Sequence, residues 1–101
     1  KEIILPQEIE GNYSGWHIYI IKTAKIVDRD KLVKFLKDNG VAVNFHYPAI
    51  YSHPYYQVLG YGKIKLQNME EYHNSCITLP CFSDLSQKNI KYIGKMIKKF
   101  F

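Results

Sequence analysis

The most regular alternation of apolar and polar positions lies at the C-terminal end of the chain. Apolar side chains recur there at intervals of three or four residues, namely Ile90, Ile93, Ile97 and Phe100. The lysines between them fall on the opposite side of a helical projection, namely Lys88, Lys91, Lys95 and Lys98. This pattern predicts an amphipathic helix with an apolar inner face and a solvated lysine face. Ser86 is suited to cap its first turn.

Two earlier segments, 16–22 and 41–45, are rich in β-branched and aromatic residues and predict strands. An apolar helical face separates them and is made of Leu32, Val33, Phe35 and Leu36. Asp28 or Asp30 is suited to the N-cap of this helix, and Gly40 to the left-handed position that closes it. The sequence therefore predicts a strand–helix–strand unit, whose strands could pair in parallel through a right-handed crossover.

The segments outside this unit are less regular. Residues 1–15 hold several glycine, proline, asparagine and serine residues and predict an extended, loop-like stretch. Residues 52–60 predict a short helix, because Pro54 is tolerated in a first helical turn and Gly60 can end it. Residues 77–79 predict one more short strand.

The arrangement of these elements indicates the fold class. Asn68 followed by Glu71 resembles a capping box and predicts a helix that runs to about Ser75. A chain of 101 residues suits one domain. Three short strands with helices between them predict an α+β fold, a two-layer α/β sandwich whose helices cover one face of the sheet. The order of the strands cannot be read from the pattern.

The charge of the chain raises the question of a polyanionic partner, because the net charge is +5 and the pI is near 9.2. Thirteen of the fourteen basic residues are lysine, and Arg29 is the only arginine. Arginine is suited to bidentate contacts with phosphates and bases, so this balance favours a solvated surface over nucleic-acid recognition. The alternative is a small basic module that binds single-stranded RNA on an aromatic-bearing sheet, but here the tyrosines cluster in a loop.

The sequence holds no self-contained catalytic constellation. Its four histidines lack the spacing of a metal site, namely His17, His46, His53 and His73. It has no nucleophile motif and no glycine-rich phosphate loop. Cys76 and Cys81 do not form a C-x-x-C pair, and we expect reduced thiols that act as small buried hydrophobes in a cytoplasmic protein. No apolar run approaches the roughly 20 residues of a membrane span, so no membrane association is expected.

Chemistry-bearing side chains concentrate in one segment, residues 44–56, which holds two histidines and four tyrosines. Tyrosine and histidine offer a flat apolar body with a hydrogen-bonding tip, which suits sugar rings and nucleotide bases. The two prolines of the segment would hold such groups in place at low entropic cost. In the alternative interpretation the tyrosines Tyr51, Tyr55 and Tyr56 only cover the sheet edge, and His53 only caps a helix.

Five short stretches of the chain occur in a recognisable order and spacing. They are Ser14-Gly15-Trp16-His17-Ile18-Tyr19, Asp28-Arg29-Asp30-Lys31-Leu32, His46-Tyr47-Pro48 with His53-Pro54-Tyr55, Leu59-Gly60-Tyr61, and Leu79-Pro80 before the last helix. Each stretch is a weak signal alone, but together they make nearly the whole chain resemble one family. It resembles the C-terminal small domain of the DegT/DnrJ/StrS-type sugar-nucleotide aminotransferases, which are fold type I enzymes that use pyridoxal phosphate.

The resemblance implies two domains with different roles, of which only the small domain is present here. Complete members move an amino group, usually from glutamate, to a nucleotide-linked keto-sugar for lipopolysaccharide, spore coats or other cell-surface polysaccharides. Their catalytic lysine and cofactor-binding residues lie in a larger N-terminal domain, and none of those motifs is present here. We therefore expect residues 1–15 to be a linker from a missing N-terminal large domain and residues 16–101 to be the small domain. This chain alone is expected to be inactive and to bind no cofactor. The full-length enzyme would use pyridoxal phosphate and form a homodimer.

The resemblance also implies site residues, because it places the aromatic loop at the mouth of the substrate pocket near a dimer interface. The candidate substrate-binding residues are His46, Tyr47, His53 and Tyr55, with no catalytic or cofactor-binding residue in this chain. Since His46 and Tyr47 are adjacent at a strand end, we expect them to point in opposite directions and only one to face the pocket. His17 is expected to be a core or interface histidine. A further alternative is a regulatory or interaction domain that only resembles this module.

Overall fold

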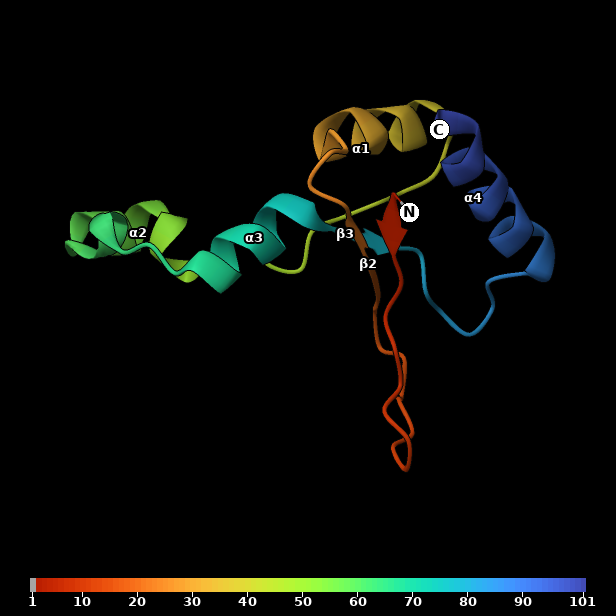
Figure 1. Cartoon of the computed structure of the whole chain (residues 1–101), viewed down its shortest axis with the longest axis horizontal. Coiled ribbons are helices and arrows are strands. Elements are labelled where there is room, and N and C mark those ends of the chain that lie inside the picture. Colours follow the sequence, from red (N-terminus) through yellow and green to blue (C-terminus); the bar gives the residue numbers. More distant parts are fainter. Residues whose placement is uncertain (1) are drawn as a thin grey trace.

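The structure is a computed structural model that describes residues 2–101 (Figure 1). Its strands are β1 (Ile3–Ile4), β2 (Tyr19–Thr23) and β3 (Cys76–Leu79). Its α-helices are α1 (Arg29–Asp38), α2 (Pro54–Val58), α3 (Gln67–Ser75) and α4 (Gln87–Phe100), and two 3₁₀ turns flank α2, namely η1 (Ile50–Ser52) and η2 (Tyr61–Lys63). The strands form one antiparallel sheet in the order β1-β2-β3.

The hydrophobic core lies between one face of this sheet and the helices α1 and α4. Ile21 of β2 and Ile77 of β3 are paired across the sheet, and both are fully buried. The helices add apolar side chains to the same cluster, namely Leu32, Val33 and Leu36 from α1 and Ile93 and Met96 from α4. Burying one such side chain contributes roughly 1.5–3 kcal/mol. The predicted α+β fold class is therefore confirmed, with α1 and α4 packed against each other and against the sheet (Figure 1).

Three predicted helix ends are confirmed. The Asp28 carboxylate caps α1 by accepting a hydrogen bond from the backbone N–H of Lys31 at 3.0 Å. Gly40 follows the helix with a φ of +75°, a value that favours glycine. The Ser86 hydroxyl caps α4 by accepting from the backbone N–H of Asn89 at 3.2 Å. Local polar side chains thus set the limits of the two helices that cover the sheet.

The prediction of a strand at 41–45 is wrong. Only Asn44 pairs with the sheet, through one antiparallel bridge to Thr78 of β3. Because β3 is also paired with β2, it lies between β2 and this segment, so the predicted parallel pairing of the two segments is wrong as well. Val41 and Val43 are nevertheless buried. Their β-branched side chains fill the core without forming a strand ladder.

The sheet is instead completed from the N-terminal side. Ile3 pairs with Thr23 and Ile4 with Lys22, so β1 arises within a segment for which only loop structure is predicted. β2 begins later than predicted, at Tyr19 instead of residue 16. The φ of Trp16 is +43°, which lies outside the extended region that a strand requires.

The predicted capping box at the start of α3 is also wrong. The N-cap residue is Leu66, whose side chain makes no capping hydrogen bond, and the helix begins at Gln67. The Glu71 carboxylate does not reach back to the first turn of backbone. It accepts hydrogen bonds from Gln67 Nε2 at 3.4 Å and Lys25 Nζ at 3.3 Å, and these side chains hold the pKa of Glu71 below its usual value.

The orientation of α4 agrees with its sequence pattern except at two positions. The lysine face is exposed, as predicted, and Ile93 is buried. Ile90, however, is 53% exposed, whereas Met96 is buried and contributes to the core in its place. Like the other helices formed by residues 2–101, α4 is too short or too polar to cross a bilayer.

The molecule is more extended than its length requires. Its radius of gyration is 15.5 Å, whereas a compact chain of 100 residues has about 13 Å. Figure 1 shows two projections that account for the difference: an N-terminal arm that leads from β1 to β2, and a lobe built around α2. We define the α2 lobe as residues 50–66. Tyr51 is the only one of its residues that is not exposed, so the lobe has no core of its own.

Candidate functional site

The candidate site is built around His46, two residues after the bridge that joins Asn44 to β3. The backbone N–H of Thr78 donates to Asn44 O at 2.8 Å, and that of Asn44 donates to Thr78 O at 3.1 Å. His46 Nδ1 lies 2.9 Å from Thr78 Oγ1, and the Tyr72 hydroxyl donates to His46 O at 2.6 Å. His46 is half-buried and Thr78 is buried. Helix α3 therefore holds the backbone of His46 through Tyr72, and the sheet holds its ring through Thr78.

The contact with Thr78 divides the functions of the two imidazole nitrogens. A threonine hydroxyl can donate to Nδ1 or accept from it, depending on the tautomer of the ring. In either case Nδ1 is used within the protein, and the other nitrogen, Nε2, is the one left to meet a ligand. This arrangement suits a histidine that forms a hydrogen bond at a fixed position.

Tyr47 lies against His46 and does not point away from it. The two rings meet edge to face, with their centroids 4.6 Å apart and their planes at 83°. The prediction that the two side chains point in opposite directions is therefore wrong. The alternation of a strand does not apply, because the chain bends at His46 and only Asn44 is part of a bridge. Tyr47 is 65% exposed and so presents its ring and hydroxyl at the surface.

A pocket of about 220 Å³ adjoins this site. Its polar wall includes His17, Asn44, His46, Thr78 and Cys81. An amide, a hydroxyl and two imidazoles can donate to and accept from hydroxyl-rich ligands. His17 lies before β2 and is exposed, so it does not belong to the core, and of the expected core or interface position the interface stays a prediction.

His53 and Tyr55 lie elsewhere, on the α2 lobe. His53 occupies the N-cap position of α2, but its side chain makes no capping hydrogen bond. Tyr55 is 69% exposed, and its ring meets the Tyr56 ring edge to face at 5.3 Å. Neither His53 nor Tyr55 lines the pocket at His46. Within this chain, the four candidate substrate residues therefore form two separate pairs.

Tyr51 connects the α2 lobe to α3. Its hydroxyl donates to Glu70 Oε1 at 2.7 Å, and this hydrogen bond raises the pKa of Tyr51 above its usual value. The interpretation in which Tyr51 only covers the sheet edge is therefore not what the contacts show. Tyr51 thus attaches the α2 lobe to α3 through a hydrogen bond, and the other residues of the lobe are exposed.

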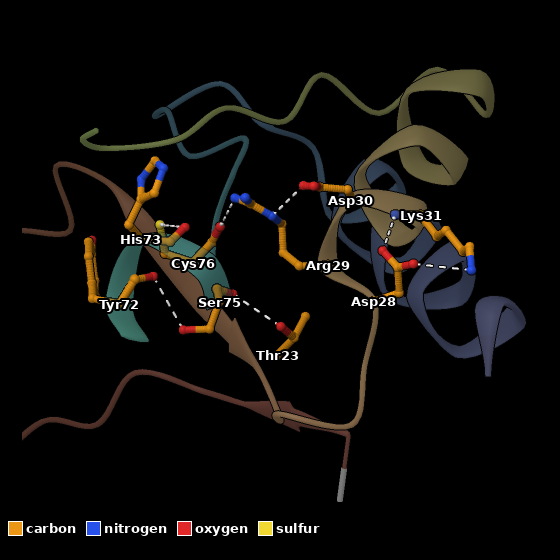
Figure 2. A network of polar contacts seen from close by, with 9 residues as sticks. All are labelled: Thr23, Asp28, Arg29, Asp30, Lys31, Tyr72, His73, Ser75 and Cys76. Atoms are coloured by element: carbon orange, nitrogen blue, oxygen red, sulfur yellow. Dashed lines mark hydrogen bonds and ion pairs between the residues drawn. The ribbon is translucent and has the colours of Figure 1, made fainter. Parts of the chain in front are cut away.

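Arg29 lies in the same part of the fold as His46, and its role is not predicted from the sequence. Figure 2 shows its contacts with Cys76 and Asp30. The Arg29 side chain is only 12% exposed. Nη1 donates to Cys76 O at 3.3 Å, and the guanidinium carbon lies 4.3 Å from the centroid of the Phe45 ring. Nε lies 2.7 Å from Asp30 Oδ1 as an ion pair, without the geometry of a hydrogen bond. The only signal in the sequence is that one arginine stands among thirteen lysines.

The same region contains two groups whose pKa is raised by burial, the buried Cys76 and the half-buried Tyr72. Burial raises the pKa of the Cys76 thiol, and the nearby charge of Arg29 opposes this shift in part. Burial also raises the pKa of the Tyr72 hydroxyl, so this group remains a donor to His46 O near neutral pH. Cys76 is fully buried, as expected, whereas Cys81 is only half-buried. Both thiols are free.

Two larger depressions lie away from His46. A polar groove of about 630 Å³ runs between the end of β2 and α3 and includes Lys25 and Glu71. An apolar groove of about 900 Å³ lies between the sheet and α4 and includes Tyr19, Leu79 and Ile97. Among residues 2–101, no group of three or more His, Cys, Asp or Glu side chains is placed to hold a metal ion.

Comparison with known proteins gives a consistent result. The model of the DegT/DnrJ/EryC1/StrS aminotransferase family matches residues 1–98. The pleiotropic regulatory protein of Geobacillus stearothermophilus is 31% identical over 100 residues, which are 98% of this chain and 26% of that protein. The UDP-4-amino-4,6-dideoxy-N-acetyl-beta-L-altrosamine transaminase of Campylobacter jejuni is 29% identical over 65 residues, which are 64% of this chain and 17% of that protein.

A solved structure agrees with these sequence matches. Helicobacter pylori PseC, an aminotransferase involved in the biosynthesis of pseudoaminic acid, matches with a TM-score of 0.76 and 26% identity. The match covers 84% of this chain and 23% of PseC. The chain thus spans about a quarter, or less, of the length of the relatives that it matches.

Proposed function

Because the chain belongs to the DegT/DnrJ/EryC1/StrS aminotransferase family, we propose that it is the C-terminal small domain of an aminotransferase that acts on a nucleotide-linked keto-sugar. The observation that carries the proposal is the family match, which extends over residues 1–98 and includes the site at His46. The substrate class is supported by relatives named as a transaminase of a UDP-linked amino sugar and an aminotransferase of pseudoaminic acid biosynthesis. Residues 1–15 then link to a large N-terminal domain and add β1 to the sheet, and residues 16–101 form the rest of the small domain.

In this proposal the cofactor, pyridoxal phosphate, belongs to the large domain. A lysine that binds it covalently needs a dry environment that lowers its pKa. Every lysine among residues 2–101 is exposed, so the residues of this chain do not fit the cofactor. The chemistry of amino transfer is therefore assigned to the rest of the longer protein, and this chain contributes to binding the sugar substrate.

His46 and Tyr47 are the proposed substrate-side pair. Thr78 occupies His46 Nδ1, which leaves Nε2 to bind a hydroxyl or phosphate oxygen of the nucleotide sugar. The exposed Tyr47 ring adds a flat apolar surface and a hydroxyl beside it. A substrate held by such fixed groups loses less freedom at the reactive step, which is how positioning contributes to catalysis.

His53 and Tyr55 form a second proposed substrate-side pair. They lie on the α2 lobe, which exposes large apolar side chains and has no core. A surface of this kind is typical of a contact with another protein surface. We assign it to the large domain or to the partner subunit of a homodimer, next to which His53 and Tyr55 would border the pocket.

The proposal is tested by half-reactions of the full-length enzyme carrying His46→Asn, His46→Gln or Tyr47→Phe. The Asn amide can replace Nδ1 and keep the contact with Thr78, whereas the Gln amide can replace Nε2. We expect His46→Asn and Tyr47→Phe to lower the specificity constant for the nucleotide sugar by about three- to tenfold, because one hydrogen bond contributes about 0.5–1.5 kcal/mol. His46→Gln should retain a higher specificity constant for the nucleotide sugar than His46→Asn. The half-reaction with the amino acid donor should remain close to normal.

The matched control for Tyr47→Phe is Tyr13→Phe, which removes a hydroxyl from a side chain that is 95% exposed on the N-terminal arm. We expect this variant to behave like the unmodified enzyme. Equal losses in both half-reactions would assign His46 and Tyr47 to folding or to the cofactor. Unchanged nucleotide-sugar kinetics in all variants would remove both residues from the substrate site.

A further inference from the structure

We infer that Arg29 is a positioning residue for His46, and that it acts by fixing the segment that carries His46 against β3. The inference rests on the proposed substrate role of His46. Arg29 touches neither His46 nor the pocket of about 220 Å³ beside it. Its effect on the substrate must therefore pass through the residues that it holds.

Besides the ion pair with Asp30, the guanidinium has two contacts, and these lie on the two segments that meet at His46. The guanidinium carbon lies over the Phe45 ring, 4.3 Å from its centroid, and Phe45 directly precedes His46. Nη1 donates to the carbonyl of Cys76 at 3.3 Å, and Cys76 opens β3, two residues before Thr78. Arg29 thus spans the same two segments as the contact between His46 Nδ1 and Thr78 Oγ1.

This bridge matters because the backbone pairing between the segments is short. They share a single isolated bridge, Asn44 with Thr78, and no further ladder. A register set by one bridge is weakly specified. The guanidinium adds a second fixed point on each side of it, since Phe45 follows Asn44 and Cys76 precedes Thr78.

The geometry requires arginine and not another cation. A planar guanidinium can stack on an aromatic ring and donate in its own plane to a carbonyl at the same time. A lysine ammonium is a point charge and cannot fill both roles from one position. The other cations among residues 2–101 are exposed lysines, whereas the Arg29 side chain is only 12% exposed. The least exposed of these cations lies over an aromatic ring and also donates to a carbonyl.

The test uses full-length enzymes that carry Arg29→Lys, His46→Ala and both changes together. We expect Arg29→Lys to lower the specificity constant for the nucleotide sugar by about three- to tenfold, the loss of one hydrogen bond, and to leave the donor half-reaction unchanged. In the His46→Ala background the same change should have no further effect, because residues that act through each other are not additive. Lys34→Gln breaks an exposed ion pair with Asp38 on the same helix. This control variant should leave the specificity constant for the nucleotide sugar unchanged.

A crystal structure of the Arg29→Lys enzyme separates this inference from the proposed function. We expect His46 Nδ1 and Thr78 Oγ1 to move beyond hydrogen-bond distance. If that contact is retained, or if the effects of Arg29→Lys and His46→Ala add, the inference is overturned. An unchanged specificity constant in His46→Ala would remove the proposed substrate role of His46, and the crystal structure would still decide the role of Arg29. Should Arg29→Lys fail to fold, Phe45→Leu removes the stacked ring and is expected to give the same kinetic pattern.

Discussion

At the scale of single residues, Thr78 contacts the neighbouring segment three times. Its backbone exchanges two hydrogen bonds with Asn44, and its hydroxyl lies 2.9 Å from His46 Nδ1. A buried hydroxyl in this position can fix the direction of an imidazole in either tautomer, because it can donate to Nδ1 or accept from it. The substrate-side histidine is thus oriented by a residue of the sheet, which is more rigid than the loop that follows.

Thr78→Val keeps the shape of this side chain and removes the hydroxyl. We expect the specificity constant for the nucleotide sugar to fall by about three- to tenfold, because His46 Nδ1 loses its partner and the ring its fixed direction. Thr78→Ser is the matched variant that keeps the hydroxyl, and it should retain most of the activity. Steady-state kinetics of the full-length enzyme measure both. An impaired Ser variant together with an unimpaired Val variant would mean that the methyl group matters and the hydroxyl does not.

A contact of a single residue could be predicted from the sequence when its partner is close along the chain, and could not when its partner is far along the chain. The cap formed by Asp28 could be predicted because its partner, Lys31, is three residues away. The role of Arg29 could not, because its partners Phe45 and Cys76 become neighbours only in the folded chain. The mutual packing of His46 and Tyr47 was missed for a related reason, since it depends on a bend that the strand pattern does not indicate.

At the scale of elements, α1 and α4 were predictable from local periodicity and caps, and β2 and β3 from strand-like composition, whereas the pairing of the sheet was not. A helix satisfies its backbone hydrogen bonds within itself, but a strand needs a partner. Residues 41–45 have strand-like composition, yet only Asn44 finds a partner. Ile3 and Ile4 lie among turn-forming residues and still become β1, because the edge of β2 is available to them.

The two faces of α4 give a prediction of stability. Ile93→Ala should lower the free energy of unfolding by about 2–5 kcal/mol, because this side chain is buried against the sheet. Ile90→Ala is the matched change on the same helix, and it should cost no more than about 0.5 kcal/mol because Ile90 is 53% exposed. Urea unfolding of the two variants compares them directly. The opposite order would show that α4 is rotated relative to the sheet.

At the scale of the whole molecule, the chain has one core and two projections. The core joins α1 and α4 to the sheet, whereas the α2 lobe and the N-terminal arm extend from it (Figure 1). The lobe exposes apolar side chains that include Tyr55, Val58 and Leu59. Exposed apolar surface of this kind is typical of an interaction site, and in the proposed longer protein the large domain or a partner subunit would cover it.

The proposed division between the domains predicts how the chain behaves with cofactor. Mixed with pyridoxal phosphate and desalted, this chain alone should retain no covalently bound cofactor, because all lysines among residues 2–101 are exposed. Absorbance of the desalted sample and mass spectrometry after borohydride reduction measure retention. Stoichiometric attachment to one lysine would contradict the assignment of the cofactor to the rest of the longer protein.

The central claim is that this chain is the small domain of an enzyme that transfers an amino group to a nucleotide-linked keto-sugar. The most direct test supplies the longer protein with pyridoxal phosphate, ¹⁵N-glutamate and a panel of nucleotide-linked keto-sugars, and follows the isotope by mass spectrometry. We predict that ¹⁵N appears in an amino sugar that is still linked to its nucleotide, and that His46→Ala slows this transfer. Transfer of ¹⁵N to free keto acids alone, with no labelled nucleotide sugar, would contradict the account.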